Sequence, residues 1–426
     1  MNAPLSCIVI TDHNAQTAQS IAAAKAYGLG PFSQIVMRSL DGDADRHGAG
    51  VDAAHAVGAQ WILFIAPGET LKKDAFVLAG PALRVYDAVW GAVSLFDGDV
   101  EVEQVIRKSG LACQGYNDFF HLVLRWWIGN SCFIKSKIAD LQRPSANTQA
   151  SRMEHLLRLW KNHRCLKTAQ PLTAVRCALP DLEKHERAFL LYHLDEHPIY
   201  RSVHSGARSC KLPYTGRNRV IEREQTRGLF YEEDELRYLQ SRIAPNSVIV
   251  DVGANTGNHT VYFALFMAAK KVIPIEPTPH AITALKRAVA VNALNTVDLS
   301  KLGIGAGSEA GVYSLKISEG GGLGATQLMP DAEGDVHVAP LDELIDEPVD
   351  VLKIDVETME MSVLEGARRL VAEYRPLVYI EIADPNTEAF MHWIDDNDYR
   401  IEKIYPDKLY ANYLISPSEL AGDADV

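Results

Sequence analysis

The sequence V-I-V-D-V-G-A-N-T-G, which runs from Val248 to Gly257, decides the fold of the second half of this chain. Its first three residues are apolar, as in a strand that is buried on both faces of a parallel sheet. Asp251 ends the apolar run, and Gly253 and Gly257 then allow a sharp turn in which backbone N–H groups can approach a ligand. The segment therefore predicts a strand, a ligand-binding loop and a helix over residues 258–269.

A second acid supports the prediction of a cofactor site. Val272, Ile273 and Ile275 predict another buried strand, which ends at Glu276, about 20 residues after the loop, where a Rossmann-type fold places a carboxylate that holds a ribose diol. A dinucleotide site usually has a glycine where Asn255 stands, because the pyrophosphate needs that room. The pattern therefore favours a nucleoside-containing cofactor other than a dinucleotide, with an ordinary strand-to-helix turn as the alternative.

The order D-x-G-x-N-x-G followed by an acid resembles the first motif of class I methyltransferases. The resemblance implies that the cofactor is S-adenosyl-L-methionine. The residues expected to bind it are Asp251, Gly253, Asn255, Gly257, Glu276 and Ile304. The four loop residues would receive the methionine end, Glu276 the ribose hydroxyls, and Ile304 or a neighbour would border the adenine.

Acidic residues also end two later predicted strands. In the segment L-K-I-D-V-E, alternation with period two places Lys353, Asp355 and Glu357 on one face of the strand. Glu381 ends the strand that is expected to lie beside it. Ligands of doubly wound sheets bind at the carboxyl ends of the strands, so we expect these carboxylates to converge where the methyl group would be. A structural ion pair between Lys353 and Asp355 is the alternative.

The second half of the chain resembles FkbM-type methyltransferases, which are S-adenosylmethionine-dependent O-methyltransferases. The matching segments, in order, are Gly228–Leu236, Val250–Thr260, Ile275–Pro277, Leu352–Glu357, Val363–Ala367 and Tyr379–Ile382. Members of that family often act on sugar hydroxyls of secondary metabolites and bacterial surface glycans, so the resemblance implies a sugar or glycan acceptor. The family usually has glycine where Thr358 stands, and the Cβ and hydroxyl of this residue are expected to alter the acceptor pocket.

Methyl transfer to an alcohol requires alignment of the donor carbon with the acceptor oxygen, and a group that accepts the hydroxyl proton. We expect Asp355 or Glu357 to be the base, with Glu381 orienting the sugar diol. His259 is the rival base, although a lone histidine at the start of a helix more often packs or caps it. Glu232 is expected to be an exposed helix acid. The clustered acids also suit a divalent metal such as magnesium, but the sequence does not require one.

The first half of the chain alternates strands and helices as a βαβαβ unit, which implies a parallel sheet. The strands are predicted at Leu5–Thr11, Ser33–Met37 and Trp61–Ile65, and the helices at Ala15–Tyr27 and Ala49–Val57. This order resembles the GT-A fold of inverting glycosyltransferases, whose Asp-x-Asp motif holds the metal of a nucleotide-sugar. Ala66 and Gly68 stand at the approximate positions of those acids, and only Glu69 is near. We therefore expect a sugar-binding or docking domain rather than an active glycosyltransferase.

The sequence thus predicts an α/β protein of two domains. Residues 1–200 would form a GT-A-like (nucleotide-diphospho-sugar transferase-like) domain, and residues 228–421 a Rossmann-like class I methyltransferase domain. Residues 201–227, rich in Arg, Ser and Gly, predict a solvated linker, and residues 422–426 an acidic tail. The glycine-rich residues 320–324 predict either an active-site lid or an exposed hairpin turn.

The composition is typical of a folded protein that handles small or neutral substrates. The hydrophobic content is 47% and the charged content 23%, and the net charge of -13 opposes non-specific binding to nucleic acid. The six cysteines contain no C-x-x-C pair, which predicts reduced thiols, a cytoplasmic location and no cysteine-built zinc site. No apolar run reaches the ~20 residues of a transmembrane helix. The sequence leaves open whether the chain forms a homo-oligomer.

Three functions are compatible with these patterns. The leading hypothesis is a sugar O-methyltransferase whose first domain helps to recognise a glycan. The second is a bifunctional enzyme that transfers a sugar and then methylates it, against which the missing Asp-x-Asp argues. The third is a binding or scaffold protein with two degraded catalytic sites, motivated by Thr358 and by Ala66 and Gly68 at metal-binding positions.

Overall fold

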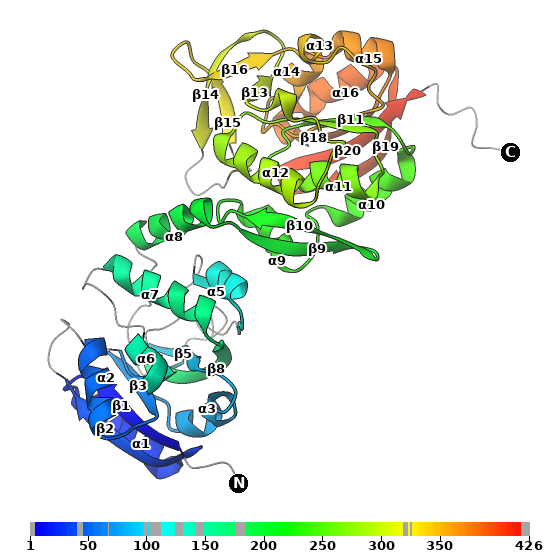
Figure 1. Ribbon diagram of the computed structural model, residues 1–426. Helices are drawn as coiled ribbons and strands as arrows, with labels where there is room; N and C mark the ends of the chain where they lie inside the picture. The colour runs from blue at the N-terminus through cyan, green and yellow to red at the C-terminus, as the bar shows by residue number, and fades with distance from the viewer. Residues whose placement is uncertain are drawn as a thin grey trace. The chain divides into compact units, whose positions relative to one another are not determined.

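The chain folds, in a computed structural model, into two compact units, residues 1–193 and residues 194–426. The structure describes residues 5–40, 46–66, 68–97, 100–101, 112–123, 131–141, 149–175, 184–317, 323 and 326–418. Figure 1 shows the helices and strands of each unit. The boundary falls before residue 200, the predicted end of the first domain.

The first unit is built around a mixed sheet with the strand order β2-β1-β3-β7-β5-β8-β4. Its elements within the described residues are β1 (Leu5–Thr11), α1 (Ala15–Tyr27), β2 (Phe32–Ser39), α2 (Arg46–Ala56), β3 (Trp61–Phe64), β4 (Glu69–Leu71), α3 (Ala75–Leu83), β5 (Ala88–Asp97), β6 (Val100–Glu101), α5 (Tyr116–Val123), β7 (Cys132–Lys135), α6 (Ser136–Leu141), α7 (Gln149–Asn162), β8 (Cys165–Val175) and α8 (Lys184–Glu196), the last of which crosses the boundary.

The parallel sheet predicted for this unit is confirmed only for its first three strands. Strands β1, β2 and β3 are parallel, whereas β7 is antiparallel to both of its neighbours, β3 and β5. Strand β4 is also antiparallel to its partner β8. The prediction is wrong beyond β3 because the alternation of strand and helix, on which it rested, ends there: β4 follows β3 without a helix between them.

Local sequence explains the first strand and the first helix of the first unit. Strand β1 and helix α1 occupy the predicted residues. Asn14 begins the helix, because its side chain accepts hydrogen bonds from the N–H groups of the first turn. Aromatic side chains then hold the sheet and a covering helix together: the rings of Phe32 and Phe133 stack, and Phe76 meets both edge-on.

The second unit contains a six-stranded sheet, a smaller sheet and a hairpin. Its elements are β9 (Ile199–Ser205), β10 (Arg208–Tyr214), α9 (Arg219–Thr226), α10 (Glu233–Arg242), β11 (Val248–Val252), α11 (Asn258–Phe266), β12 (Lys271–Ile275), α12 (Pro279–Val291), η1 (Leu299–Lys301), β13 (Ile304–Ala306), β14 (Gly311–Ile317), β15 (Thr326–Pro330), β16 (Val336–Ala339), α13 (Leu341–Leu344), β17 (Val351–Ile354), α14 (Glu360–Glu365), α15 (Arg368–Tyr374), β18 (Leu377–Ala383), η3 (Asp384–Asn386), α16 (Thr387–Asp396), β19 (Tyr399–Pro406) and β20 (Tyr410–Pro417).

The main sheet has the order β12-β11-β17-β18-β20-β19. Strands β12, β11, β17 and β18 are parallel, and β20 lies antiparallel between β18 and β19. The carboxyl ends of the four parallel strands therefore meet at one edge of the sheet. This edge is where the sequence predicts the cofactor and the acids.

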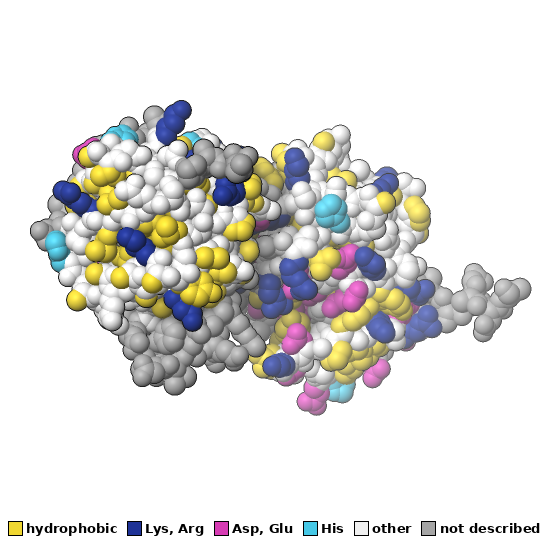
Figure 2. Space-filling view, turned by 90° about the horizontal axis from the view of Figure 1, so that it is seen from below, with side chains coloured by type: hydrophobic (Ala, Val, Ile, Leu, Met, Phe, Trp, Pro, Cys, Tyr) yellow, Lys and Arg dark blue, Asp and Glu magenta, His cyan; other side chains and the backbone are white. Residues whose placement is uncertain are grey.

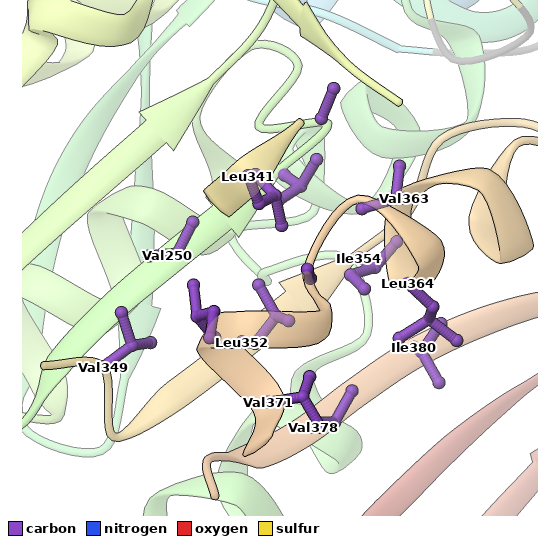
Figure 3. Close-up of a cluster of buried hydrophobic side chains, with 14 of the residues drawn as sticks. Val250, Leu341, Val349, Leu352, Ile354, Val363, Leu364, Val371, Val378 and Ile380 are labelled. Atoms are coloured by element: carbon purple, nitrogen blue, oxygen red, sulfur yellow. The ribbon is translucent and has the colours of Figure 1, made fainter. Parts of the chain in front are cut away.

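Two hydrophobic cores cover the two faces of this sheet. One contains side chains of α13, α14, α15 and α16, and Figure 3 shows Val250, Leu352 and Ile380 of three strands beside Val363 and Val371 of two of those helices. The other contains side chains of α10, α11 and α12 and of the hairpin β9–β10. Because both faces are covered, the strands are apolar along most of their length.

The predicted linker, residues 201–227, forms the hairpin β9–β10 and the helix α9 instead of a solvated connection. Val203, Cys210 and Leu212 are buried in the same core as α11 and α12. Burial alternates along β9, so its apolar residues face the core while polar ones face outward. That period of two is diluted by the Arg, Ser and Gly content, which is why composition alone misled the prediction.

Two other segments have irregular forms. Residues 297–302 contain the short helix η1, and isolated bridges join Val297 to β12 and Leu302 to Glu276. Helices α14 and α15 are separated from each other at Gly366. A Cβ at Gly366 would lie 2.0 Å from the backbone oxygen of Gly307, so this close contact requires glycine.

The smaller sheet has the order β13-β16-β14-β15. Strands β14 and β15 pair antiparallel. The glycines of the predicted lid, residues 320–322 and 324, lie outside the described residues, as does the tail, residues 422–426. Within the described chain, no helix is long and apolar enough to cross a membrane.

Candidate active site

The glycine loop lies at the carboxyl end of β11 and is fixed by two close backbone contacts. The N–H of Gly253 donates to the carbonyl of Ile275 at 2.9 Å, which ties the loop to β12. Gly253 has φ 75°, and a Cβ there would lie 1.7 Å from the backbone oxygen of Asp355. A side chain at this position would push β11 and β17 apart, so the first glycine of the motif is required by the chain itself.

Glu276 lies beside the loop, as the sequence predicts, and binds it directly. Its carboxylate accepts hydrogen bonds from the N–H of Asn255 at 2.8 Å and from the N–H of Thr278 at 2.7 Å. Burial raises the pKa of Glu276, and these hydrogen bonds oppose the shift. Each carboxylate oxygen accepts one bond from the backbone and keeps a second lone pair, which leaves acceptors for a ligand hydroxyl.

Ile304 lies next to this acid. It begins β13, and the N–H of the preceding residue, Gly303, donates to the backbone carbonyl of Glu276 at 2.9 Å. Ile304 is partly buried. The predicted ribose and adenine contacts therefore come from neighbouring segments.

Asp251 and Lys353 are buried, and together with the partly exposed Asp355 they form a chain of charges between β11 and β17. The ammonium of Lys353 lies 3.2 Å from Asp251 and 3.4 Å from Asp355, and it donates to the carbonyl of Gly253 at 3.0 Å. Asp251 also accepts a hydrogen bond from the hydroxyl of Thr260. Burial opposes the charge of Lys353, yet attraction by Asp251 and Asp355 raises the pKa of this lysine. The Lys353–Asp355 ion pair, the alternative to a functional role, is present, and it reaches the cofactor loop as well.

Three carboxyl groups converge at the same edge: Asp355, Glu357 and Glu381 each place one oxygen within 4.8 Å of the other two. Burial and the charges of Asp355 and Glu357 raise the pKa of Glu381 to about 10. Burial, Asp355 and Glu360 raise the pKa of Glu357 to about 7. At neutral pH, Glu381 is therefore protonated and Glu357 is near its midpoint. Such a group of carboxyl oxygens can orient a diol, exchange a proton or hold a divalent ion.

His259 and Glu232 meet in a second polar cluster. The Nε2 atom of His259 lies 3.0 Å from Glu232, whose other oxygen accepts from Asn412 at 3.1 Å. Burial opposes ionisation of Glu232, but the neighbouring imidazole of His259 lowers its pKa. Glu235 accepts hydrogen bonds from Asn412 and from the hydroxyl of Tyr379. Glu232 is thus buried beside His259 rather than an exposed helix acid.

This second cluster adjoins the first, because Asn412 pairs with Glu381 across β18 and β20. No sequence motif indicated that Asn412, Tyr379 or Glu235 belongs to the site. Their separation along the chain exceeds any local pattern, and only the pairing of β18 with β20 brings them together. The one signal available was the acidic run E-E-D-E at residues 232–235.

Thr358 occupies a left-handed backbone conformation. Its φ is 80°, and that of Glu357 is 51°. The N–H of Thr358 donates to the carboxylate of Glu360 at 2.6 Å, and its carbonyl accepts from Asn386 at 3.1 Å. The turn that carries the acid cluster is therefore held by hydrogen bonds in a conformation that suits glycine, the residue expected there.

In the first unit, the segment compared with an Asp-x-Asp site has no exposed acid. Glu69 is buried, and its carboxylate accepts a hydrogen bond from the hydroxyl of Ser131 at 2.7 Å. The same hydroxyl accepts from the N–H of Ala66 at 2.9 Å. The acid nearest to the missing motif is thus used to hold the strand end in place.

Comparison with known families bears on the second unit. Residues 251–401 match the model of the methyltransferase FkbM domain. The match begins at Asp251 and includes every residue predicted for the cofactor and the acids. It supports a methyltransferase function for this region. Glu232, Asn412 and the whole first unit lie outside it. No curated protein matches the chain.

The comparison with solved structures found partial similarities. The methyltransferase FkbM from Methylobacillus flagellatus KT is 22% identical over 41% of this chain and 44% of its own, with a TM-score of 0.31. An rRNA methylase from Streptococcus thermophilus is 14% identical over 44% of this chain and 95% of its own, with a TM-score of 0.30. The alignment thus spans less than half of the Methylobacillus chain.

Proposed function

We propose that the second unit is an S-adenosylmethionine-dependent O-methyltransferase that methylates a hydroxyl of a sugar or glycan. The observation that carries the proposal is the FkbM domain match at residues 251–401, whose first residue opens the glycine loop. Within this match, the loop, its neighbouring acid Glu276 and the converging carboxyl groups stand at one edge of the sheet.

The residues fit this cofactor. Gly253 and Asn255 are the partly exposed residues of the loop, while Ala254, Thr256 and Gly257 are buried. Glu276 offers carboxylate lone pairs for ribose hydroxyls beside them. The carboxyl groups around Asp355 provide negative potential that suits a positively charged sulfonium.

Bound S-adenosylmethionine would supply a methyl group activated by its sulfonium. Glu381, protonated at neutral pH, donates a hydrogen bond that orients the acceptor diol. Glu357, whose pKa is about 7, accepts the proton of the attacking hydroxyl. Asp355 is held by Lys353 and orders the two glutamates around the acceptor. These roles refine the expected choice between Asp355 and Glu357 as base.

A divalent ion is the competing use of the same three carboxyl groups. We favour hydroxyl recognition, because the ammonium of Lys353 already lies 3.4 Å from Asp355 and would repel a dication. A chelator is therefore expected to leave the rate of methyl transfer unchanged. A loss of activity that Mg²⁺ restores would assign the cluster to a metal.

The net charge of the chain and its resemblance to FkbM-type methyltransferases both support a sugar or glycan acceptor. The net charge of -13 opposes a nucleic acid acceptor. Among the described side chains on the face drawn in Figure 2, Lys and Arg lie scattered between acidic and hydrophobic ones and form no continuous basic surface. We infer that the first unit has a GT-A-like fold and contributes glycan binding rather than sugar transfer, because Glu69, the acid near the missing motif, is engaged with Ser131.

The proposed function is tested by incubating the full chain with S-adenosylmethionine that carries a deuterated methyl group, together with a panel of mono- and oligosaccharides. Mass spectrometry is expected to find the label on a saccharide oxygen and to find far less with Glu276→Ala. Label on a protein, a nucleic acid or an amine instead of a saccharide hydroxyl would overturn the assignment of the acceptor.

A further inference from the structure

Asn218 lies against the cofactor loop although it precedes the family match by more than thirty residues. Its side-chain N–H₂ donates to the side-chain oxygen of Asn255 at 3.2 Å. We propose that Asn218 and Asn255 together bind the amino-acid end of S-adenosylmethionine. This inference rests on the proposed function and adds a binding residue from a segment that was predicted to be a linker.

The turn that carries Asn218 is rigidly built. The buried carboxylate of Glu222 accepts hydrogen bonds from the N–H of Thr215 at 2.6 Å, from the hydroxyl of Thr215 at 2.7 Å and from the N–H of Gly216 at 3.0 Å. Arg217 makes a two-pronged ion pair with Asp195, at 2.9 and 2.7 Å. The position of Asn218 is therefore fixed from both sides before any ligand arrives.

Asn218 does not use its side chain in the way its position would suggest. It is the residue before the first turn of α9, where an asparagine side chain usually accepts a hydrogen bond from a backbone N–H and stabilises the helix. No such capping bond is present in α9. The side chain donates to Asn255 instead, so it contacts the loop and does not cap the helix.

Asn255 is fixed in a matching way. Its backbone has φ 48°, and its N–H is bound by Glu276. Asn255 and Gly253 are the partly exposed residues of the loop, which marks the side of the loop that a ligand can reach. Asn218 is 2% exposed and borders that side through its contact with Asn255.

The two amides leave one acceptor and one donor unused. In the described part of the chain, the side-chain oxygen of Asn218 and the side-chain N–H₂ of Asn255 make no further hydrogen bond. An α-amino acid carries an ammonium, which needs an acceptor, and a carboxylate, which needs a donor. The pair therefore complements the zwitterionic end of the cofactor, with Asn218 facing the ammonium and Asn255 the carboxylate.

The test compares two ligands that differ in the amino-acid end. S-adenosylhomocysteine carries this end, and 5′-methylthioadenosine lacks it. In calorimetric titrations of the full chain, Asn218→Ala is expected to weaken S-adenosylhomocysteine about tenfold, the usual loss for a hydrogen bond to a charged group, and to leave 5′-methylthioadenosine unchanged. Val220→Ala, an exposed change in the same helix, is the matched control and should alter neither affinity.

A further variant keeps the test independent of folding. Asn218→Asp preserves the size of the side chain and keeps an acceptor for the ligand ammonium, so it should weaken S-adenosylhomocysteine less than Asn218→Ala. Thermal unfolding of each variant verifies the fold. An unchanged affinity for S-adenosylhomocysteine, or an equal loss for both ligands, overturns the inference and leaves the proposed function intact. Failure of the unaltered protein to bind either ligand overturns both.

Discussion

The backbone of Thr358 is strained. A β-branched residue at φ 80° is rare, because its Cβ meets the neighbouring backbone. Its side chain is exposed, and the hydrogen bonds that hold the turn use only its backbone. The hydroxyl therefore offers no packing that would compensate for the strain.

Thr358→Gly is expected to stabilise the protein by about 1 kcal/mol, because glycine adopts the observed conformation without strain. Urea unfolding measures the change. Thr283→Gly, at an exposed position inside α12, is the matched control and should destabilise by a similar amount. A loss of stability with Thr358→Gly would mean that the threonine side chain makes a favourable contact.

Glu357 gives the pH dependence of the proposed reaction. Because burial and Asp355 raise its pKa to about 7, the carboxylate form that accepts a proton increases as pH rises through that value. The value of kcat/KM should therefore increase with pH through about 7 and level off above it. Glu357→Gln should remove this step and lower kcat by about 10² or more.

Glu365→Gln, on the exposed side of α14, is the control for this profile and should leave it unchanged. A step near pH 7 that survives in Glu357→Gln would transfer the role of base to another group, with His259 beside Glu232 the first to examine.

The sequence predicted the residues of the glycine loop better than the polar residues around it. Gly253, Asn255 and Glu276 belong to one motif, whose spacing along the chain indicates that these residues lie close together in the fold. Glu232 lies beside His259, and Asn412 binds Glu232 from the other end of the second unit. No pattern of spacing along the chain carries that information. Their closeness follows from the placement of α10 and β20 at the same sheet edge.

The register of strands β11 and β17 is coupled to a buried charge pair. In their parallel register, Asp251 lies opposite Lys353, and both side chains are buried at the sheet edge. The charge pair therefore fixes which residues of the two strands end together. That register in turn places Asp355 beyond β17, over Gly253.

Lys353→Met should destabilise the second unit by about 3–5 kcal/mol, because it leaves the buried carboxylate of Asp251 without its cation. Urea unfolding monitored by tryptophan fluorescence measures the loss. Adding Asp251→Asn to this variant should restore part of the stability, because it removes the unpaired charge. Lys270→Met, at an exposed site nearby, should change stability by less than about 0.5 kcal/mol.

No recovery in the double variant would show that the two charges stabilise the sheet independently.

Strands β1, β11 and β12 and helix α1 were predicted well, because continuous apolar runs mark the strands and Asn14 marks the start of the helix. The break between α14 and α15 was not, because it depends on the close approach of Gly366 to a distant backbone oxygen. The hairpin β9–β10 was missed because its few apolar residues become informative only against the core that they cover.

At the scale of the whole molecule, the chain has separate hydrophobic cores in its two units. Differential scanning calorimetry is expected to resolve two transitions. S-adenosylhomocysteine at about 100 times its Kd should stabilise only one of them, by about 2.7 kcal/mol, because it binds one folded unit. A shift of both transitions, or of neither, would contradict an assignment of the ligand to the second unit.

We propose that the glycine loop and Glu276 form a site for S-adenosylmethionine. Isothermal titration of the full chain with S-adenosylmethionine measures this binding directly. We predict saturable binding to one site, weakened about tenfold by Glu276→Ala, which removes the carboxylate that serves the ribose and holds the loop. The absence of binding by the unaltered chain, or full affinity in Glu276→Ala, would contradict the account.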